Sequence, residues 1–196
     1  WVHLNAISTA QSVAQVRDAR QQGVRVTASA PARALLLTDA DVDHSDYDTS
    51  LRLVPPLRPE LDRLALVDAV RRGDICLTSA HLPLSRVEKE HEFERAMPGA
   101  AGLETAFAAA LTALDGDIEA VGRALAVGPA ELLGRRPRLE AGAVANLVLV
   151  DSEATIQAAQ PAASRGVNEP LAGRSLRGRV VGTMVAGRWV YSSIGA

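Results

Sequence analysis

Apolar and polar positions alternate in blocks over the first two thirds of the chain. Four short apolar runs have the length of buried strands, at residues 2–7, 24–30, 51–54 and 74–78. Between and after them, apolar residues recur at helical spacing, in helices expected at residues 8–22, 38–41, 59–72, 102–114, 117–127 and 129–133. Strands that alternate with helices predict a parallel sheet with crossover helices.

Local signals refine three of these helices. Asp115 or Asp117 is expected to cap the helix that ends before Gly128. Ser8 and Gln11 form an S-x-x-Q capping box, which predicts Ser8 as the first helix's N-cap. The helix that opens at Pro59-Glu60 has a predicted buried face made of Leu61, Leu64, Val67, Ala69 and Val70.

The pattern changes after Gly134. Strand-like runs at residues 147–150, 178–185 and 189–191 are separated by loops rich in Pro, Gly and Ser. Ala186-Gly187 between the last two runs predicts a hairpin turn. We therefore expect two units, an α/β unit at residues 1–134 and a small β unit at residues 135–196.

Composition narrows the possible functions. Hydrophobic residues make up 47% of the chain and aromatic residues only 3%, so the core must consist of Leu, Val and Ala. The net charge is −2, and neither nucleic acid nor an anionic membrane is an expected partner. No apolar run reaches transmembrane length. Cys76 is the single cysteine, so an internal disulfide is excluded. We therefore expect a cytoplasmic protein. Because the chain has strand character from its first residues, we expect it to be a fragment.

The candidate chemistry is sparse. The four histidines, at positions 3, 44, 81 and 91, include no pair at metal-binding spacing. No phosphate-binding Gly-rich loop and no G-x-S-x-G motif is present. Cys76 is interpreted as a small buried apolar residue. The stretch at residues 77–85 follows a buried strand, where α/β barrels place their chemistry, yet Ala80 stands where a carboxylate would be useful.

Four motifs, in the right order, resemble those of one family. Residues 47–58 (YDTSLRLVPPLR) are similar to Y-D-T-N-L-K-V-N-P-P-L-R, and residues 102–106 read G-L-E-T-A. Residues 142–151 resemble G-A-D-A-D-L-V-L-F-D, and residues 178–181 match the closing strand. Over nearly its whole length the chain resembles the dihydroorotases, cyclic amidohydrolases of pyrimidine biosynthesis, and within them the non-catalytic homologues.

The resemblance implies a fold. It is an α/β fold, the C-terminal part of a metal-bearing (β/α)8 TIM-type barrel with strands of a small β-sandwich. Residues 1–134 would supply the fifth to eighth barrel strands, and residues 135–196 the sandwich strands. A whole barrel needs about 250 residues, so the first strands, with the H-x-H metal pair, would lie upstream of residue 1.

The resemblance also implies that the catalytic site has been lost. Ala6 and Arg33 stand at the two metal-binding histidine positions, and Ala80 stands at the position of the aspartate that binds metal and accepts the proton of the attacking water. We therefore expect no catalytic residue and no metal ligand in this chain. The remaining substrate-pocket positions are Val54, Arg58, His81 and Leu84, of which Val54 replaces an asparagine and Leu84 a histidine.

Three functions stay open at this point. The first is a non-catalytic, oligomeric scaffold that needs no cofactor and binds the catalytic subunit of aspartate transcarbamoylase, a partner implied by the resemblance. The second is an active, zinc-dependent dihydroorotase or related cyclic amidohydrolase with an altered site, built from upstream residues and His81. The third is a barrel that binds a small molecule without reacting, with Arg33 and Arg58 as anion contacts. Whether the protein is an enzyme is therefore undecided from the sequence.

Overall fold

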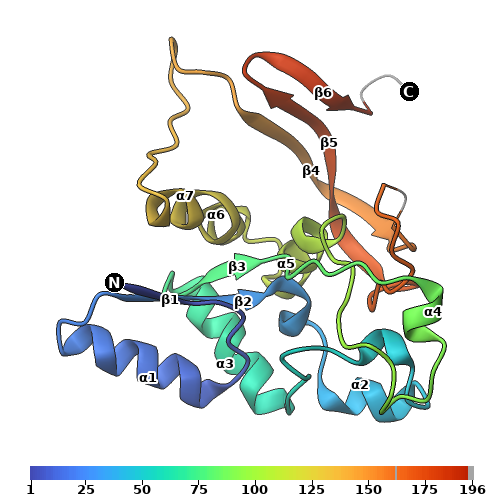
Figure 1. The fold of residues 1–196 in the computed structure, drawn as a ribbon. Helices are drawn as coiled ribbons and strands as arrows, with labels where there is room; N and C mark the ends of the chain where they lie inside the picture. The colour runs from blue at the N-terminus through green and yellow to red at the C-terminus, as the bar shows by residue number, and fades with distance from the viewer. Residues whose placement is uncertain (162, 194–196) are drawn as a thin grey trace.

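The computed structural model describes residues 1–161 and 163–193, and these residues form two sheets (Figure 1). The first sheet is parallel, in the order β1-β2-β3, and consists of β1 (Val2–Leu4), β2 (Val26–Pro31) and β3 (Cys76–Thr78). The second sheet is antiparallel, in the order β4-β5-β6, and consists of β4 (Leu147–Gln157), β5 (Ser175–Val185) and β6 (Arg188–Ser192). A parallel sheet followed by an antiparallel one agrees with the change of pattern in the sequence.

Helices surround the parallel sheet. The α-helices are α1 (Ala10–Gln21), α2 (Asp39–His44), α3 (Glu60–Arg71), α4 (Arg86–Lys89), α5 (Ala106–Ala113), α6 (Ile118–Gly122) and α7 (Gly128–Leu132). Two 3-10 turns, η1 (Ala32–Leu35) and η2 (Thr49–Leu51), and a π-helical segment, η3 (Arg123–Val127), complete the set. Figure 1 shows α1 and α3 together on one side of the sheet and α6 and α7 on the other. No described helix is long and apolar enough to cross a membrane.

The core is built from Leu, Val and Ala, as the low aromatic content requires. A larger cluster joins the parallel sheet to α1, α3, α5 and α6 through fully buried side chains such as Val16, Val70 and Leu111. A smaller cluster joins α5 to the antiparallel sheet and the loop before β5, through Ala109, Leu171 and Leu176. Helix α5 therefore contacts both sheets, and the predicted division at residue 134 stays a prediction. Residues 162 and 194–196 of the predicted second unit lie outside the described residues.

The strand expected at residues 51–54 does not form. Residues 49–51 are the 3-10 turn η2, which Asp48 caps by accepting a hydrogen bond from the Ser50 backbone N–H. Pro55 and Pro56 lack a backbone donor for a strand ladder. Strand β2 pairs directly with β3, Ser29 opposite Cys76. The described sheet thus has three parallel strands where four were expected, and the apolar residues of 51–54 pack as a loop.

Helix α1 begins one residue later than the capping box predicts. Thr9 is its N-cap, and the Thr9 hydroxyl accepts a hydrogen bond from the Ser12 backbone N–H. Ser8 is buried, and its hydroxyl accepts a bond of 3.3 Å from Arg58 Nε. The serine is therefore occupied by a contact from a distant segment, which the local pattern could not reveal.

The inward face of α3 is also different from the predicted one. Leu61 and Leu64 are 80% and 47% exposed. The position that turns inward in the first half of the helix is Arg63, whose Nη1 donates to the Leu35 carbonyl over 2.8 Å. The buried residues are Leu66, Val67, Ala69 and Val70, so only the second half of the predicted face is correct.

Three turn and cap predictions can be compared directly with the structure. Asp117 caps α6 by accepting a bond from the Ala120 N–H. Ala186 and Gly187 both have positive φ in the turn between β5 and β6, as the hairpin prediction requires. The helix expected to stop before Gly128 instead continues through η3 into α7, because Gly128 keeps a helical backbone. Its missing side chain leaves room for Cys76, whose Sγ would lie 2.7 Å from a Cβ there.

Candidate functional site

Three positions at which the family resemblance predicts substituted catalytic groups lie at one edge of the parallel sheet. Ala6 follows β1, Arg33 lies in η1 directly after β2, and Ala80 follows β3. The carboxyl ends of adjacent parallel strands lie together, which is where barrels of this type carry their chemistry. Ala6 and Ala80 both have a left-handed backbone, with φ of 58° and 42°, so the chain turns sharply at each of these two strand ends.

Arg33 is the largest group at this edge, and it is only 5% exposed. Its Nη1 donates to the carbonyl of Ser79 over 2.8 Å, and its Nη2 donates to the carbonyl of Ala80 over 3.2 Å. A Cβ on Gly102 would lie 3.0 Å from Arg33 Nη1, so the neighbouring backbone closes tightly over the guanidinium. The guanidinium therefore holds the end of β3 against the end of β2.

A second buried charge, Glu169, accompanies Arg33. Glu169 is 2% exposed, and its carboxylate accepts bonds from Thr105 Oγ1 and from the Leu171 N–H, over 2.9 and 3.0 Å. Burial lowers the pKa of Arg33 to about 10, and the negative charge of Glu169 opposes that shift. Burial likewise raises the pKa of the Glu169 carboxyl, opposed mainly by its backbone hydrogen bond to Leu171. Sequence reasoning missed Glu169 because it lies in an irregular loop, where no periodicity marks a buried residue.

The His81 side chain binds backbone N–H groups of the segment that leads into α5. Its Nδ1 accepts hydrogen bonds from the N–H groups of Gly102 and Leu103, over 3.2 and 3.3 Å. Two donors on Nδ1 require a lone pair there, which leaves the proton of the neutral ring on Nε2. The imidazole thus fastens the loop after β3 to the segment that leads into α5.

The other predicted substrate-pocket positions do not join this group. Leu84 is buried, and its N–H donates to Asn168 Oδ1 over 2.9 Å. Val54 is 67% exposed on a separate loop, where it lines a different cavity. Arg58 lies further along that loop against Ser8, beside a cavity of only about 10 Å³. Of the four, only His81 and Leu84 lie on the loop after β3.

Ala6, Arg33 and Ala80 do not fit a zinc ion. Zinc in proteins is bound by imidazole nitrogen, thiolate sulfur or carboxylate oxygen. The three family positions instead present two methyl groups and a guanidinium, which has donors but no lone pair. Within residues 1–161 and 163–193, no group of three or more His, Cys, Asp or Glu side chains could hold a metal ion.

His3 and Cys76, the two other candidate residues, also have structural surroundings that account for them. His3 Nδ1 lies 2.9 Å from Thr27 Oγ1 and His3 Nε2 lies 3.2 Å from Ser29 Oγ, within a hydrogen-bonded network of side chains. Cys76 is half-buried, and burial raises the pKa of its thiol. A thiol held protonated is a poor nucleophile, which agrees with the interpretation of Cys76 as a packing residue.

Solved structures identify the class to which this fold belongs. The chain superposes on the L-hydantoinase (dihydropyrimidinase) of Arthrobacter aurescens with a TM-score of 0.89 and 24% identity, over 97% of this chain and 44% of that one. It superposes on the dihydropyrimidinase of Brevibacillus agri NCHU1002 with a TM-score of 0.85 and 19% identity, over the same shares. The fold is thus that of part of a (β/α)8 barrel together with strands of a small β-sandwich, as predicted.

Sequence relatives narrow the class to one family. The chain is 35% identical to the dihydroorotase of Desulforapulum autotrophicum and 38% identical to that of Anaeromyxobacter dehalogenans strain 2CP-1, over 97% of this chain in each case. No protein-family model matches the chain. The chain belongs to the dihydroorotase family of cyclic amidohydrolases, and it spans about 45% of the length of these relatives.

Proposed function

We propose that this chain is part of a non-catalytic, dihydroorotase-like protein of pyrimidine biosynthesis. The observation that carries the proposal is the buried guanidinium of Arg33, bonded to the Ser79 and Ala80 carbonyls at a metal-histidine position of the family. Hydrolysis of a cyclic amide in this family needs a metal-activated water and a base beside it. A buried cation repels a metal ion, and the methyl groups of Ala6 and Ala80 offer neither a ligand atom nor a proton acceptor.

Metal analysis and an activity assay on the full-length protein test this proposal. We expect no stoichiometric zinc and no turnover of dihydroorotate, with the dihydroorotase of Anaeromyxobacter dehalogenans assayed in parallel as the active control. Stoichiometric zinc together with turnover of dihydroorotate or a hydantoin would contradict it, and would favour the altered-site enzyme. That alternative would use His81, whose Nδ1 already accepts two backbone hydrogen bonds.

We further propose a scaffold role, in which the full-length protein oligomerises with the catalytic subunit of aspartate transcarbamoylase. The support is the family resemblance combined with a preserved scaffold around a substituted site: the G-L-E-T-A segment at residues 102–106 remains while Ala6 and Ala80 do not retain side-chain function. A tagged full-length protein should co-purify with the transcarbamoylase subunit. Its deletion should lower transcarbamoylase activity or assembly, and unchanged activity with no co-purification would refute the scaffold role.

We place this function in the cytoplasm, where the family's metabolism takes place. The single cysteine, Cys76, agrees with a reducing compartment. Cell fractionation with an antibody against the full-length protein tests the location, and recovery in a membrane or secreted fraction would contradict it.

A further inference from the structure

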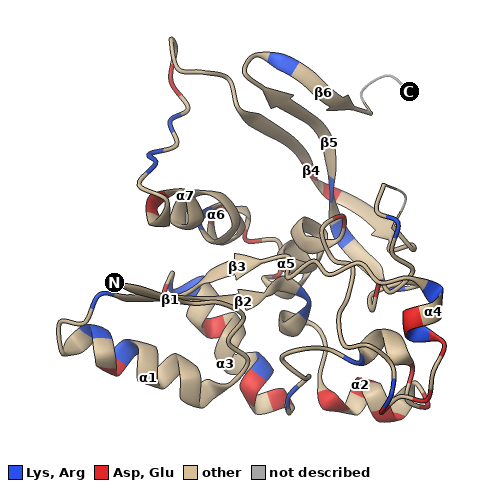
Figure 2. Ribbon diagram, in the orientation of Figure 1, with Lys and Arg blue, Asp and Glu red and all other residues tan. Residues whose placement is uncertain are grey.

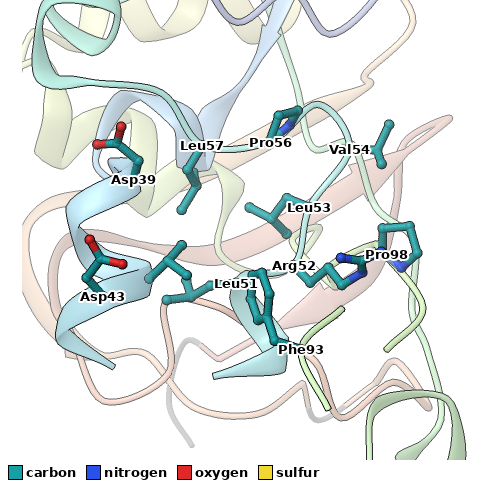
Figure 3. A pocket seen from close by; sticks show the side chains of 11 residues that line it. Asp39, Asp43, Leu51, Arg52, Leu53, Val54, Pro56, Leu57, Phe93 and Pro98 are labelled. Atoms are coloured by element: carbon teal, nitrogen blue, oxygen red, sulfur yellow. The ribbon is translucent and has the colours of Figure 1, made fainter. Parts of the chain in front are cut away.

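A cavity of about 420 Å³ lies apart from the substituted catalytic edge (Figure 3). Its apolar floor consists of Leu51, Leu53 and Leu57. Figure 3 shows the carboxylates of Asp39 and Asp43 on one side of this floor and the Arg52 side chain on the other. Neither Ala6, Arg33, Ala80 nor His81 lines it. An apolar cavity of this size with a few charged groups is typical of a small-molecule site.

Arg52 presents hydrogen-bond donors that the described protein does not use. Its Nε is buried and has no hydrogen-bond partner, and no ion pair of its guanidinium occurs among residues 1–161 and 163–193. Its carbonyl accepts from Lys89 Nζ over 3.4 Å, and its guanidinium lies 5.8 Å from the centre of the Phe93 ring. A buried donor without a partner costs free energy unless another molecule supplies an acceptor.

The opposite side of the cavity carries negative charge. Asp39 is the first residue of α2 and Asp43 follows one turn later, so both lie on the same face of the helix. Asp43 accepts a hydrogen bond from the Tyr47 hydroxyl. Neither carboxylate forms an ion pair with Arg52 in the described part of the chain. Opposite charges that line one cavity without pairing leave room for a ligand that pairs with both.

We propose that this cavity binds a small zwitterion, in which a carboxylate and an ammonium group are separated by an apolar body of several carbon atoms. The carboxylate would pair with the Arg52 guanidinium, the geometry that arginine matches best. The ammonium would lie between Asp39 and Asp43, and the carbon chain would cover the leucine floor. Because the cavity has two carboxylates and one guanidinium, it disfavours the binding of dianions. The proposal does not depend on whether the protein is catalytic.

Isothermal titration of the full-length protein with 6-aminohexanoate tests the proposal. Hexanoate and hexylamine serve as controls, because each keeps the carbon chain and one of the two charges. We expect 6-aminohexanoate to bind at least tenfold more tightly than either control. Absence of binding, or equal binding of the three compounds, would overturn the proposal.

Two variants locate the binding in this cavity. Arg52→Gln and Asp39→Asn should each weaken 6-aminohexanoate binding at least tenfold. Asp39 is exposed and its carboxylate holds no hydrogen bond within the described residues, so this second variant keeps the test valid if Arg52→Gln does not fold. The matched control is Arg95→Gln, an arginine with a 78% exposed side chain that pairs with Glu92 near the cavity without lining it. Unchanged affinity in both cavity variants would refute the site.

Discussion

Arg33 shows what a buried arginine needs at the end of a strand. Its guanidinium carries a positive charge and needs hydrogen-bond acceptors. The Ser79 and Ala80 carbonyls supply those acceptors, and the buried Glu169 supplies the opposite charge. Ala80 can accept a hydrogen bond from Arg33 only through its backbone carbonyl, because its side chain is a methyl group. Arg33 and the backbone at Ala80 are therefore coupled to each other.

Removing the Arg33 charge should expose this coupling. Arg33→Met removes the positive charge that acts on the buried Glu169 and leaves the Ser79 and Ala80 carbonyls without their donor, which should cost about 1–3 kcal/mol. The double variant Arg33→Met/Glu169→Gln should lose less than the sum of the single losses, by at least about 1 kcal/mol. Urea unfolding of the four proteins in this cycle measures the difference. Additive losses would show that the two charges act independently.

Lys89 makes the stability depend on pH. It is 6% exposed, and its Nζ donates to the Thr49 carbonyl over 2.7 Å. Burial lowers the pKa of Lys89 from 10.5 to about 8. Between these two values the unfolded chain binds more protons than the folded one, so the free energy of unfolding should rise with pH from about 8 to 10.5. Urea unfolding across this range should show a smaller rise for Lys89→Met; an equal rise in both proteins would rule out Lys89 as its source.

At the scale of single elements, helix ends and loops depend on contacts from outside the element. Helix α1 is capped by Thr9, because Arg58 engages Ser8 from another segment. Figure 2 shows residues of both charge signs on α3, and Arg63 turns inward where a leucine was expected. Local sequence patterns predict where these helices lie, but they predict the buried faces and the end residues of the helices less well.

The two candidate caps of α1 can be separated by mutation. Thr9→Ala removes the acceptor for the Ser12 N–H and should destabilise the protein by about 1 kcal/mol. Ser8→Ala removes only a bond of 3.3 Å from Arg58 and should cost less than about 0.5 kcal/mol. Thermal or urea unfolding of both variants provides the comparison. A larger loss for Ser8→Ala would restore the sequence-based assignment of the cap.

At the scale of the whole molecule, helix α5 and the loop before β5 join the parallel and antiparallel sheets. Asn168 is fully buried in this loop, and its Nδ2 donates to the Leu82 and Gly99 carbonyls while its Oδ1 accepts from the Leu84 N–H. The loop after β3 is thereby tied to the antiparallel part of the chain. The negative charge of Glu169, next in sequence, acts on Arg33 from the same loop.

A pair of glycines tests the packing between α5 and β5. Gly178 has φ +93°, and a Cβ there would lie 2.5 Å from Leu111 Cδ2 and 2.9 Å from Phe107 Cε1. Gly173 has φ +83° with nothing within 4 Å. Gly173→Ala should therefore cost about 1 kcal/mol from backbone strain alone, and Gly178→Ala a further ~1–3 kcal/mol from overpacking. Equal losses in urea unfolding would show that α5 yields at this contact.

The sequence alone determined the class of fold. Alternating strand and helix patterns depend on neighbouring residues, so the change from the α/β part to the β part could be read directly. The assignment of Ala6, Arg33 and Ala80 to the family's catalytic positions stays a prediction from ordered motifs, and the structure places the three residues after adjacent strands. The strand and helix pattern depends on neighbouring residues, and the motifs depend on similarity to a known family, so both can be read from the sequence.

The tertiary structure alone decided which distant groups meet. The charge of Glu169 acts on Arg33, and Arg58 donates to Ser8, and each of these interactions joins segments far apart in the chain. The same is true of residues 51–54, whose apolar pattern suited a strand but which pack as a loop. The physical reason is that burial and charge pairing are settled by three-dimensional packing, which leaves no periodic signal in irregular loops.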